Sequence, residues 1–585
     1  MKLYAVSVDE SGSCDTPPPL SPSDQEGLGL SDSSCHRALR CAEVLENVLE
    51  EFNSCDLNDK RNFFLDVALV CKAFLDPAMA VLWRELPHLS PLYRVLIPDD
   101  VLKTLTACWI SQPDVASQLE MQMTRSIPSP GSGRWARFMH YAAYVRRVLS
   151  IELNGFETEL FRHLAGRNNS RSVLPSLQIF KCEIPRHQTA YLHSLLLFSS
   201  PTVHTLELVS SDSCIVFLDP AGSPHHSLTG AIAQAFPSLF SLDVDLRDPP
   251  PEDVLEFTTG LAALKQLCKL KLQWPGCALE PHHLRMLTSG LPHLASLSTH
   301  INGFSDAHAK QLDRVLAPSL RRLKCGGTWD DIVRLPHALE CPALDELRLA
   351  LHRPSTSTLL EALCECVRAI SGQVFAPRLR LLGIFATAAG LARDYAAGAA
   401  QAPQRRSIAD ILAPLAALES LEDLTFEIVY PRGAMLLVPL CSDDNMRTVA
   451  AALRRAGRVS LAVRQDPNMP RLYGRTQSSE SPSTPTLHSL VHFVTMCPQL
   501  TSLALAPVVV PPLMLMIACK GMPTCSAPNL RELHLNADGQ ATPTNASRSL
   551  AIYLDKLFPN LEISACRLDS DIKDALRDAR KSRVA

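Results

Sequence analysis

The sequence predicts an α/β fold: a curved solenoid with parallel strands on its concave face and helices outside, preceded by a small three-helix domain. A short apolar phrase, leucine-x-x-leucine-x-leucine, recurs along most of the chain, as at Leu344–Leu349. A segment near the N-terminus instead carries apolar residues at helical spacing, as at Val44, Leu45, Val48 and Leu49. The length of 585 residues is too great for one compact core and also favours a repeat architecture.

The apolar phrase occurs thirteen times, and several neighbouring copies start 24 to 29 residues apart. This spacing is typical of leucine-rich repeats, in which each unit supplies a strand and a helical segment. Many copies follow a proline two residues before the first apolar position, where its fixed φ suits the turn that enters a strand. The copies begin at Val148, Leu177, Val203, Leu239, Leu267, Leu294, Leu320, Leu344, Leu379, Leu421, Leu500, Leu530 and Leu561.

Helical periodicity separates the phrases at Glu252–Leu261, Pro281–Leu291 and Ser305–Leu316. The alternation within each phrase directs the leucines into the core and the intervening side chains to the concave face, where mixed polar residues suit a protein or peptide partner. The long interval after Leu421 includes a disordered-looking insertion near 465–486, which leaves open whether the array is continuous there. The candidate substrate-binding residues are Lys271, Gln273, His300, Lys324 and Arg348.

Three short amphipathic helices are predicted between residues 36 and 90. The second carries an apolar stripe from Phe64 to Phe74, and we expect Asp76 to cap the third helix, with Pro77 at its first position. A helical trio this small usually leaves apolar surface for a partner.

This trio resembles an F-box domain, especially those of mushroom-forming fungi, through Glu43–Leu49, Ala68–Phe74 and Leu82–Trp83. The family's leading Leu-Pro is replaced by Arg40 and Cys41. F-box domains bind the Skp adaptor of Skp–cullin–F-box ubiquitin ligases, and the repeats resemble the ribonuclease-inhibitor-like type found in many F-box proteins. The resemblance implies core or adaptor-contact roles for Val44, Leu45, Val48, Leu49, Leu69, Val70, Cys71, Phe74, Leu82 and Trp83.

The predicted organisation has five parts. They are a disordered Ser/Pro-rich tail (1–35), the F-box-like domain (36–90), a helical connector and loop (91–135), the solenoid (136–570) and a charged C-terminal tail (571–585).

Composition excludes several classes of partner. With 56 basic and 60 acidic residues, the net charge is −4, and no basic cluster suggests nucleic acid or an anionic membrane.

The uncharged run Leu503–Cys519 contains three prolines and is better read as a buried strand followed by a loop and helix than as a membrane span. The 19 cysteines lie mostly in apolar phrases, as Cys71 does, and no secretory signal opens the chain. We therefore expect a cytoplasmic or nuclear protein.

No phosphate loop, zinc-protease motif or nucleophile elbow is present, so we predict no catalytic residue, cofactor or metal. The pair Cys364 and Cys366 has no matching second pair at zinc spacing, and the adjacent His282 and His283 are not expected to share a metal. The function that this pattern favours is a substrate receptor of a Skp–cullin–F-box ligase. The alternative is a leucine-rich-repeat scaffold whose N-terminal helices only cap the array. An enzyme with a site dispersed in sequence is a third hypothesis.

Overall fold

The structure is a computed structural model in which the chain forms two compact units, Met1–Glu85 and Leu86–Ala585. The predicted N-terminal tail and most of the predicted insertion lie outside the described residues. The structure describes residues 41–52, 57–111, 116–151, 156–169, 171–184, 195–210, 228–245, 254–273, 278–304, 314–352, 359–387, 406–430, 441–465, 485–506, 527, 529–535 and 544–584.

The first unit contains the three predicted helices, α2 (Ala42–Glu51), α3 (Leu57–Val70) and α4 (Lys72–Arg84). The end of α4 is joined to α2 by the Arg84 guanidinium, which donates to the Glu46 carboxylate at 3.0 Å. The core is formed by apolar side chains from all three helices: Leu49, Phe64, Ala68, Ala78 and Val81.

The boundary between α3 and α4 lies at Cys71, so the predicted helix start at Asp76 and Pro77 is wrong. Cys71 has an extended backbone, with φ −162° and ψ 165°, and α4 continues through both Asp76 and Pro77. Pro77 cannot donate to the preceding turn, but it is buried, and tertiary packing of this face outweighs the missing hydrogen bond. Cys71 provides no side-chain cap, so the sequence carries no sign of the true boundary.

The second unit is built on a long sheet whose strands follow one another in chain order. The pairings from β2 to β16 are parallel, which confirms the predicted solenoid. The strands of this sheet in the described residues are β1 (Glu85–Leu86), β2 (Arg147–Val148), β3 (Ile179–Ile184), β4 (Thr205–Ser210), β5 (Ser241–Asp245), β6 (Lys269–Gln273), β7 (Ser296–Ile301), β9 (Arg322–Thr328), β11 (Glu346–His352), β12 (Leu381–Thr387), β13 (Asp423–Tyr430), β14 (Arg458–Gln465), β15 (Ser502–Ala506) and β16 (Glu532–Leu535).

A tight turn before the strand explains the recurring proline. Leu344 N donates to Cys341 O at 3.1 Å across a turn in which Pro342 is the second residue. Proline favours this position because its fixed φ matches the turn. Within the strands, buried and partly exposed residues alternate, as in β13, so one face meets the core and the other is the concave face.

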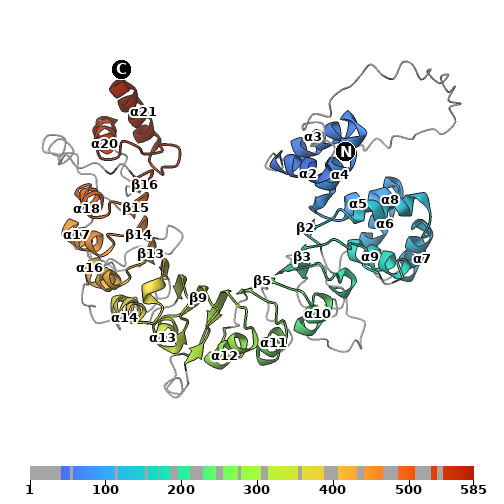
Figure 1. The fold of residues 1–585 in the computed structure, drawn as a ribbon, viewed down its shortest axis with the longest axis horizontal. Helices are drawn as coiled ribbons and strands as arrows, with labels where there is room; N and C mark the ends of the chain where they lie inside the picture. The colour runs from blue at the N-terminus through green and yellow to red at the C-terminus, as the bar shows by residue number, and fades with distance from the viewer. Residues whose placement is uncertain are drawn as a thin grey trace, which may run out of the picture. The chain divides into compact units, whose positions relative to one another are not determined.

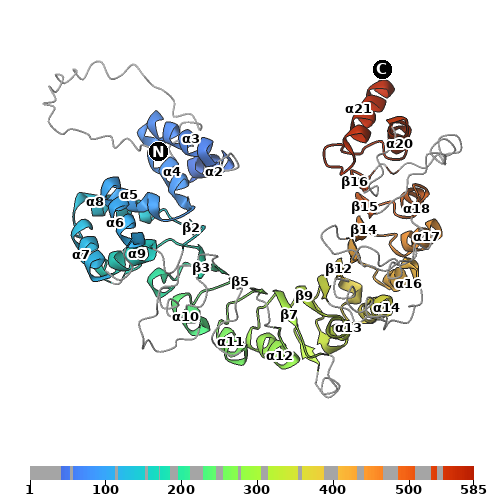
Figure 2. The same cartoon turned by 180° about the vertical axis from the view of Figure 1, so that it is seen from behind.

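Helices lie on the outer side of this curved sheet, as Figure 1 and Figure 2 show from opposite sides. Val315 and Leu316, expected at the end of a helix, instead form β8, which pairs with β10 (Leu339–Glu340), while residues 305–313 lie outside the described residues. The outer helices are α10 (Leu228–Ala235), α11 (Val254–Leu261), α12 (Pro281–Gly290), α13 (Trp329–Ala338), α14 (Leu359–Ser371), α16 (Ile408–Leu412), α17 (Asp443–Ala452) and α18 (His488–Met496).

The array continues through the long interval after Leu421, where β14 fills the gap. Strand β14 pairs with β13 on one side and β15 on the other. Ala456, 1% exposed, stands where other copies have their first leucine, and Ala456 N makes the same turn bond to Leu453 O at 2.9 Å. In contrast, the last copy, at Leu561, forms no strand in the described residues and contributes only a bridge between His534 and Arg567.

Both ends of the solenoid are covered by helices of the second unit. At the start, Tyr93 Oη donates to Glu157 O at 2.7 Å, and Tyr93 is buried. Residues 571–584, predicted as a charged tail, lie in a helix whose Arg580 and Arg583 contact Asp555 at 3.1 and 3.2 Å. The end helices are α5 (Ser90–Leu96), α6 (Asp99–Ser111), α7 (Ala116–Ser126), α8 (Gly133–Ala142), α9 (Phe156–Arg167), α20 (Thr544–Leu557) and α21 (Ser570–Val584).

No helix of the described residues is both long and apolar enough to cross a membrane. Of the uncharged run beginning at Leu503, the first four residues lie in β15, and the remainder falls outside the described part of the chain.

Native-state thiol labelling is expected to separate the cysteines by burial. Cys341 and Cys366 are buried, and desolvation raises the pKa of each thiol to about 12. Cys71, which lies in an apolar phrase and was expected at a core or adaptor-contact position, is exposed. At about pH 8, iodoacetamide should therefore modify Cys71 and spare Cys341 and Cys366 until denaturant is added, because the thiolate is the reactive form. Peptide mass spectrometry reads this directly, and equal native labelling of all three would contradict the fold.

Candidate protein-interaction surfaces

The predicted adaptor residues divide into core and surface positions of the first unit. Leu45 and Leu49 on α2 are buried, at 2% and 4% exposed, and so belong to the core. Val44 and Val48 lie one helical turn apart on the same helix and are 41% and 51% exposed. The positions on α4 are intermediate: Phe74, Leu82 and Trp83 are each half-buried.

The most exposed apolar side chains of the described residues stand at the junction of α3 and α4. Leu69 is 81% exposed and Val70 is 71% exposed, with exposed Cys71 beside them and Leu75, at 45%, one turn into α4. We call these four residues the junction patch. Aliphatic side chains this exposed gain nothing from burial, and clusters of them commonly mark a surface that a partner covers.

An aromatic pair lies on the same unit but was not predicted as a contact. The rings of Phe52 and Phe63 have centroids 5.1 Å apart, and the side chains are 46% and 38% exposed. Phe63 precedes the fully buried Phe64, so the helix turns one ring inward and leaves its neighbour at the surface. The sequence did indicate an exposed ring here, because Phe63 is an apolar residue that falls outside the stripe of core residues on its helix.

The five predicted substrate-binding residues lie on one face of four neighbouring strands, β6, β7, β9 and β11. Lys271 Nζ lies 2.8 Å from the Asp243 carboxylate of the neighbouring strand β5, so this lysine is paired within the sheet. The His300 ring is 6.0 Å from that of His352. Gln273, at the end of β6, is half-buried.

Lys324 and Arg348 lie side by side in the sheet register and surround a carboxylate that sequence reasoning missed. Glu346 Oε1 is 2.9 Å from Arg348 Nε and 3.9 Å from Lys324 Nζ, and Glu346 Oε2 is 3.7 Å from Arg322 Nε. Glu346 and Arg322 occupy the first position of their strands, two residues before Arg348 and Lys324. Because side chains alternate between the two faces of a strand, they lie on the same concave face as Arg348 and Lys324. This alternation is the sequence pattern from which both residues could have been predicted.

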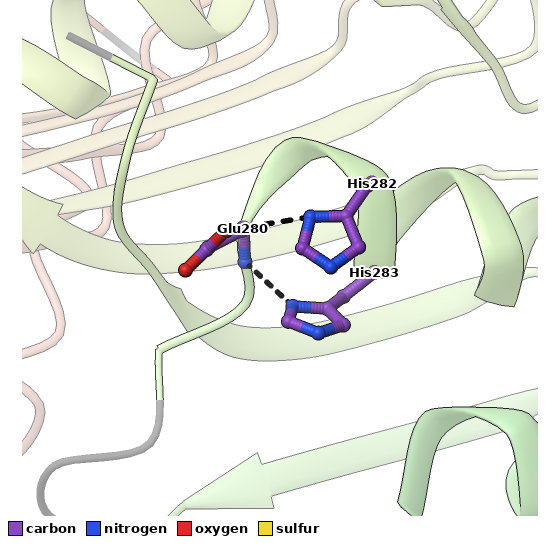
Figure 3. A group of neighbouring side chains, drawn as sticks. All are labelled: Glu280, His282 and His283. Carbon is purple, nitrogen blue, oxygen red and sulfur yellow. Dashed lines mark hydrogen bonds and ion pairs between the residues drawn. The ribbon is translucent and has the colours of Figure 1, made fainter. Parts of the chain in front are cut away.

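One group of three potential metal ligands lies together in the described residues, at the start of α12: Glu280, His282 and His283 (Figure 3). The two imidazole rings have centroids 3.7 Å apart, so these adjacent side chains lie together although they were not expected to share a metal. Glu280 N donates to His283 Nδ1 at 3.3 Å, and the Glu280 side chain completes a capping box. The positive end of the helix dipole disfavours a cation there, so the geometry fits a helix cap better than a metal centre.

The geometry defines a class of protein: a leucine-rich-repeat solenoid with a separate three-helix unit that exposes an apolar patch. No protein-family model and no curated protein matches the chain.

Several solved structures show a distant similarity to the chain. They include a protein from Bacteroides fragilis (13% identity over 54% of this chain and 71% of that one, TM-score 0.29). A chain of the yeast Rad7–Elc1 complex has 14% identity over 67% of this chain and 87% of its own, with a TM-score of 0.32. A leucine-rich-repeat protein of Leptospira interrogans has 13% identity over 73% of this chain and 97% of its own, with a TM-score of 0.29. Similarities this distant carry no inference about function.

Proposed function

We propose that this chain is a non-catalytic substrate-recognition subunit of a Skp–cullin–F-box ubiquitin ligase, acting in the cytoplasm or nucleus. The first unit binds the Skp adaptor, and through it a cullin, while the concave face of the solenoid binds a protein substrate. The observation that carries the proposal is the junction patch, where Leu69 and Val70 are 81% and 71% exposed on an F-box-like trio.

The mechanism is proximity. Holding a substrate and a ubiquitin-conjugating enzyme in one assembly raises the effective concentration of substrate lysines near the activated ubiquitin. The chain itself needs only two binding surfaces. A separate adaptor-binding unit and a long polar concave face meet that requirement.

The alternative scaffold function assigns the three helices to capping the array. The second unit has N-terminal helices of its own, and two of them, α5 and α9, are joined by the hydrogen bond from Tyr93 Oη to Glu157 O. This observation favours a separate role for the first unit.

Co-purification tests the proposal through Leu69→Asp and Val70→Asp. Both side chains are exposed, so the substitutions should leave the unit folded while placing a charge in an apolar interface. We expect adaptor binding to fall by about 30-fold or more, the size of an interface hot spot. Leu45→Asp is unsuitable because Leu45 is 2% exposed and its replacement would unfold the unit.

The matched controls are Leu316→Asp and Val374→Asp, which charge apolar side chains that are 55% and 62% exposed on the solenoid. They should retain wild-type adaptor binding. Equal binding by the junction variants and the controls would rule out the junction patch as the adaptor surface.

A further inference from the structure

The concave face is not uniformly charged, and cations gather around β9 and β11. Arg322, Lys324 and Arg348 surround the carboxylate of Glu346, so three positive charges meet one negative charge. Their side chains are 60%, 47% and 41% exposed, whereas that of Glu346 is 15% exposed. The carboxylate therefore lies beneath the cations, and a partner approaching this face meets positive charge first.

Glycine shapes the floor beside these cations. A Cβ atom at Gly383, the register partner of Arg348, would stand 3.1 Å from Arg348 Cγ and 3.0 Å from Phe385 Cε2. The missing side chain thus lets the Arg348 stem and the Phe385 ring lie over the same strand. At Gly326 a Cβ would stand 2.6 Å from the His300 ring, so a second glycine leaves room for that ring.

An apolar surface continues from this point across the sheet. Ala350 is paired in register with the half-buried Phe385, and Leu381 is half-buried at the first position of the same strand. Aromatic and aliphatic groups therefore border the cations on the β12 side. The arrangement places an anion-binding corner next to an apolar shelf on one continuous face.

Beyond this shelf lies a further carboxyl group, that of Asp423 on β13. Burial raises its pKa, despite the nearby positive charges of Arg458 and Arg348. Farther along, Arg464 contacts Glu427, so these two charges pair with each other. Arg322, Lys324 and Arg348 outnumber the single carboxylate that they contact, that of Glu346, while Arg348 also faces Asp423.

We propose that this corner and shelf bind an extended protein segment in which an anionic side chain, a carboxylate or a phosphate, stands next to an apolar residue. The anion contacts Lys324 and Arg348, and the apolar side chain packs on Phe385 and Ala350. This inference rests on the proposed function only in assigning partner binding to the concave face, and it names the class of substrate.

The test is a selection of displayed random peptides about twelve residues long, which extend about 40 Å and can cross several strands. Peptides selected on the full-length protein should be enriched in an acidic residue beside an apolar one. Lys324→Glu with Arg348→Glu should weaken the selected peptides by about 10-fold or more in fluorescence anisotropy, since a charged hydrogen bond is involved. Replacing the acid by glutamine should weaken binding similarly, and a phosphoserine peptide identifies which anion binds better.

The control is Lys181→Glu, which makes the charge change of Lys324→Glu alone, at the same register position on β3. It should leave peptide binding unchanged. Failure to enrich acidic peptides, or equal loss in the Lys181 variant, would overturn the assignment. Adaptor co-purification measured on the same variants separates this result from the ligase proposal, because charges on the solenoid should not alter the junction patch.

Discussion

Phe64→Ala is expected to unfold the first unit and leave the solenoid folded. Phe64 is fully buried and packs in the small core to which all three helices contribute. Removing a buried phenylalanine side chain costs about 3–5 kcal/mol. The three helices run from Ala42 to Arg84. A domain of that length has roughly 2–6 kcal/mol of stability at the usual 0.05–0.15 kcal/mol per residue, so the substitution removes most or all of it.

Hydrogen exchange followed by mass spectrometry measures the effect for each helix. Peptides from α2, α3 and α4 should lose protection, while those from β3 to β16 keep it. Phe63→Ala is the matched control because Phe63 is 38% exposed, and it should cost about 1 kcal/mol. The scaffold alternative predicts instead that β2 and β3 lose protection as the first unit unfolds.

Leu461→Asp is expected to break the solenoid at β14. Leu461 is 3% exposed in a strand held between β13 and β15. An unpaired carboxylate at such a position costs at least about 4 kcal/mol. Each repeat contacts only its neighbours, so the damage should concentrate in the adjoining repeats.

Limited trypsin digestion detects this opening, because Arg458 and Arg464 lie within β14 itself. The variant should be cut at both arginines, whereas the wild type should resist. Ala462→Asp, one residue along, points to the concave face and is half-buried, so it should remain resistant. If the two aspartate variants behaved alike, the strand assignment would be wrong.

Much of the solenoid was predictable because its repeats use a proline turn and two core leucines. The turn at Pro342 followed by Leu344 and Leu347 shows how directly this pattern specifies a strand. Strand β14 was missed because Ala456 replaces the first leucine and Arg454 occupies the usual proline position. The turn still forms because an ordinary residue can adopt the same backbone angles.

The candidate sites were predictable as segments but not as surfaces. Val44 and Leu45 are adjacent in an apolar run, yet one is 41% exposed and the other 2%. Only the packing of α2 on α4 decides between them. Similarly, the cations around Glu346 come partly from the neighbouring strand β9. Which side chains meet there depends on how the two strands pair, and the spacing of residues in the sequence does not encode that pairing.

Calorimetric titration of the purified full-length chain with a Skp adaptor tests the central claim most directly. We predict saturable 1:1 binding that is lost in Leu69→Asp with Val70→Asp and retained in Leu316→Asp, with each variant shown to be folded by circular dichroism. The absence of binding by the folded wild-type chain, or binding unaffected by the junction substitutions, would contradict the account.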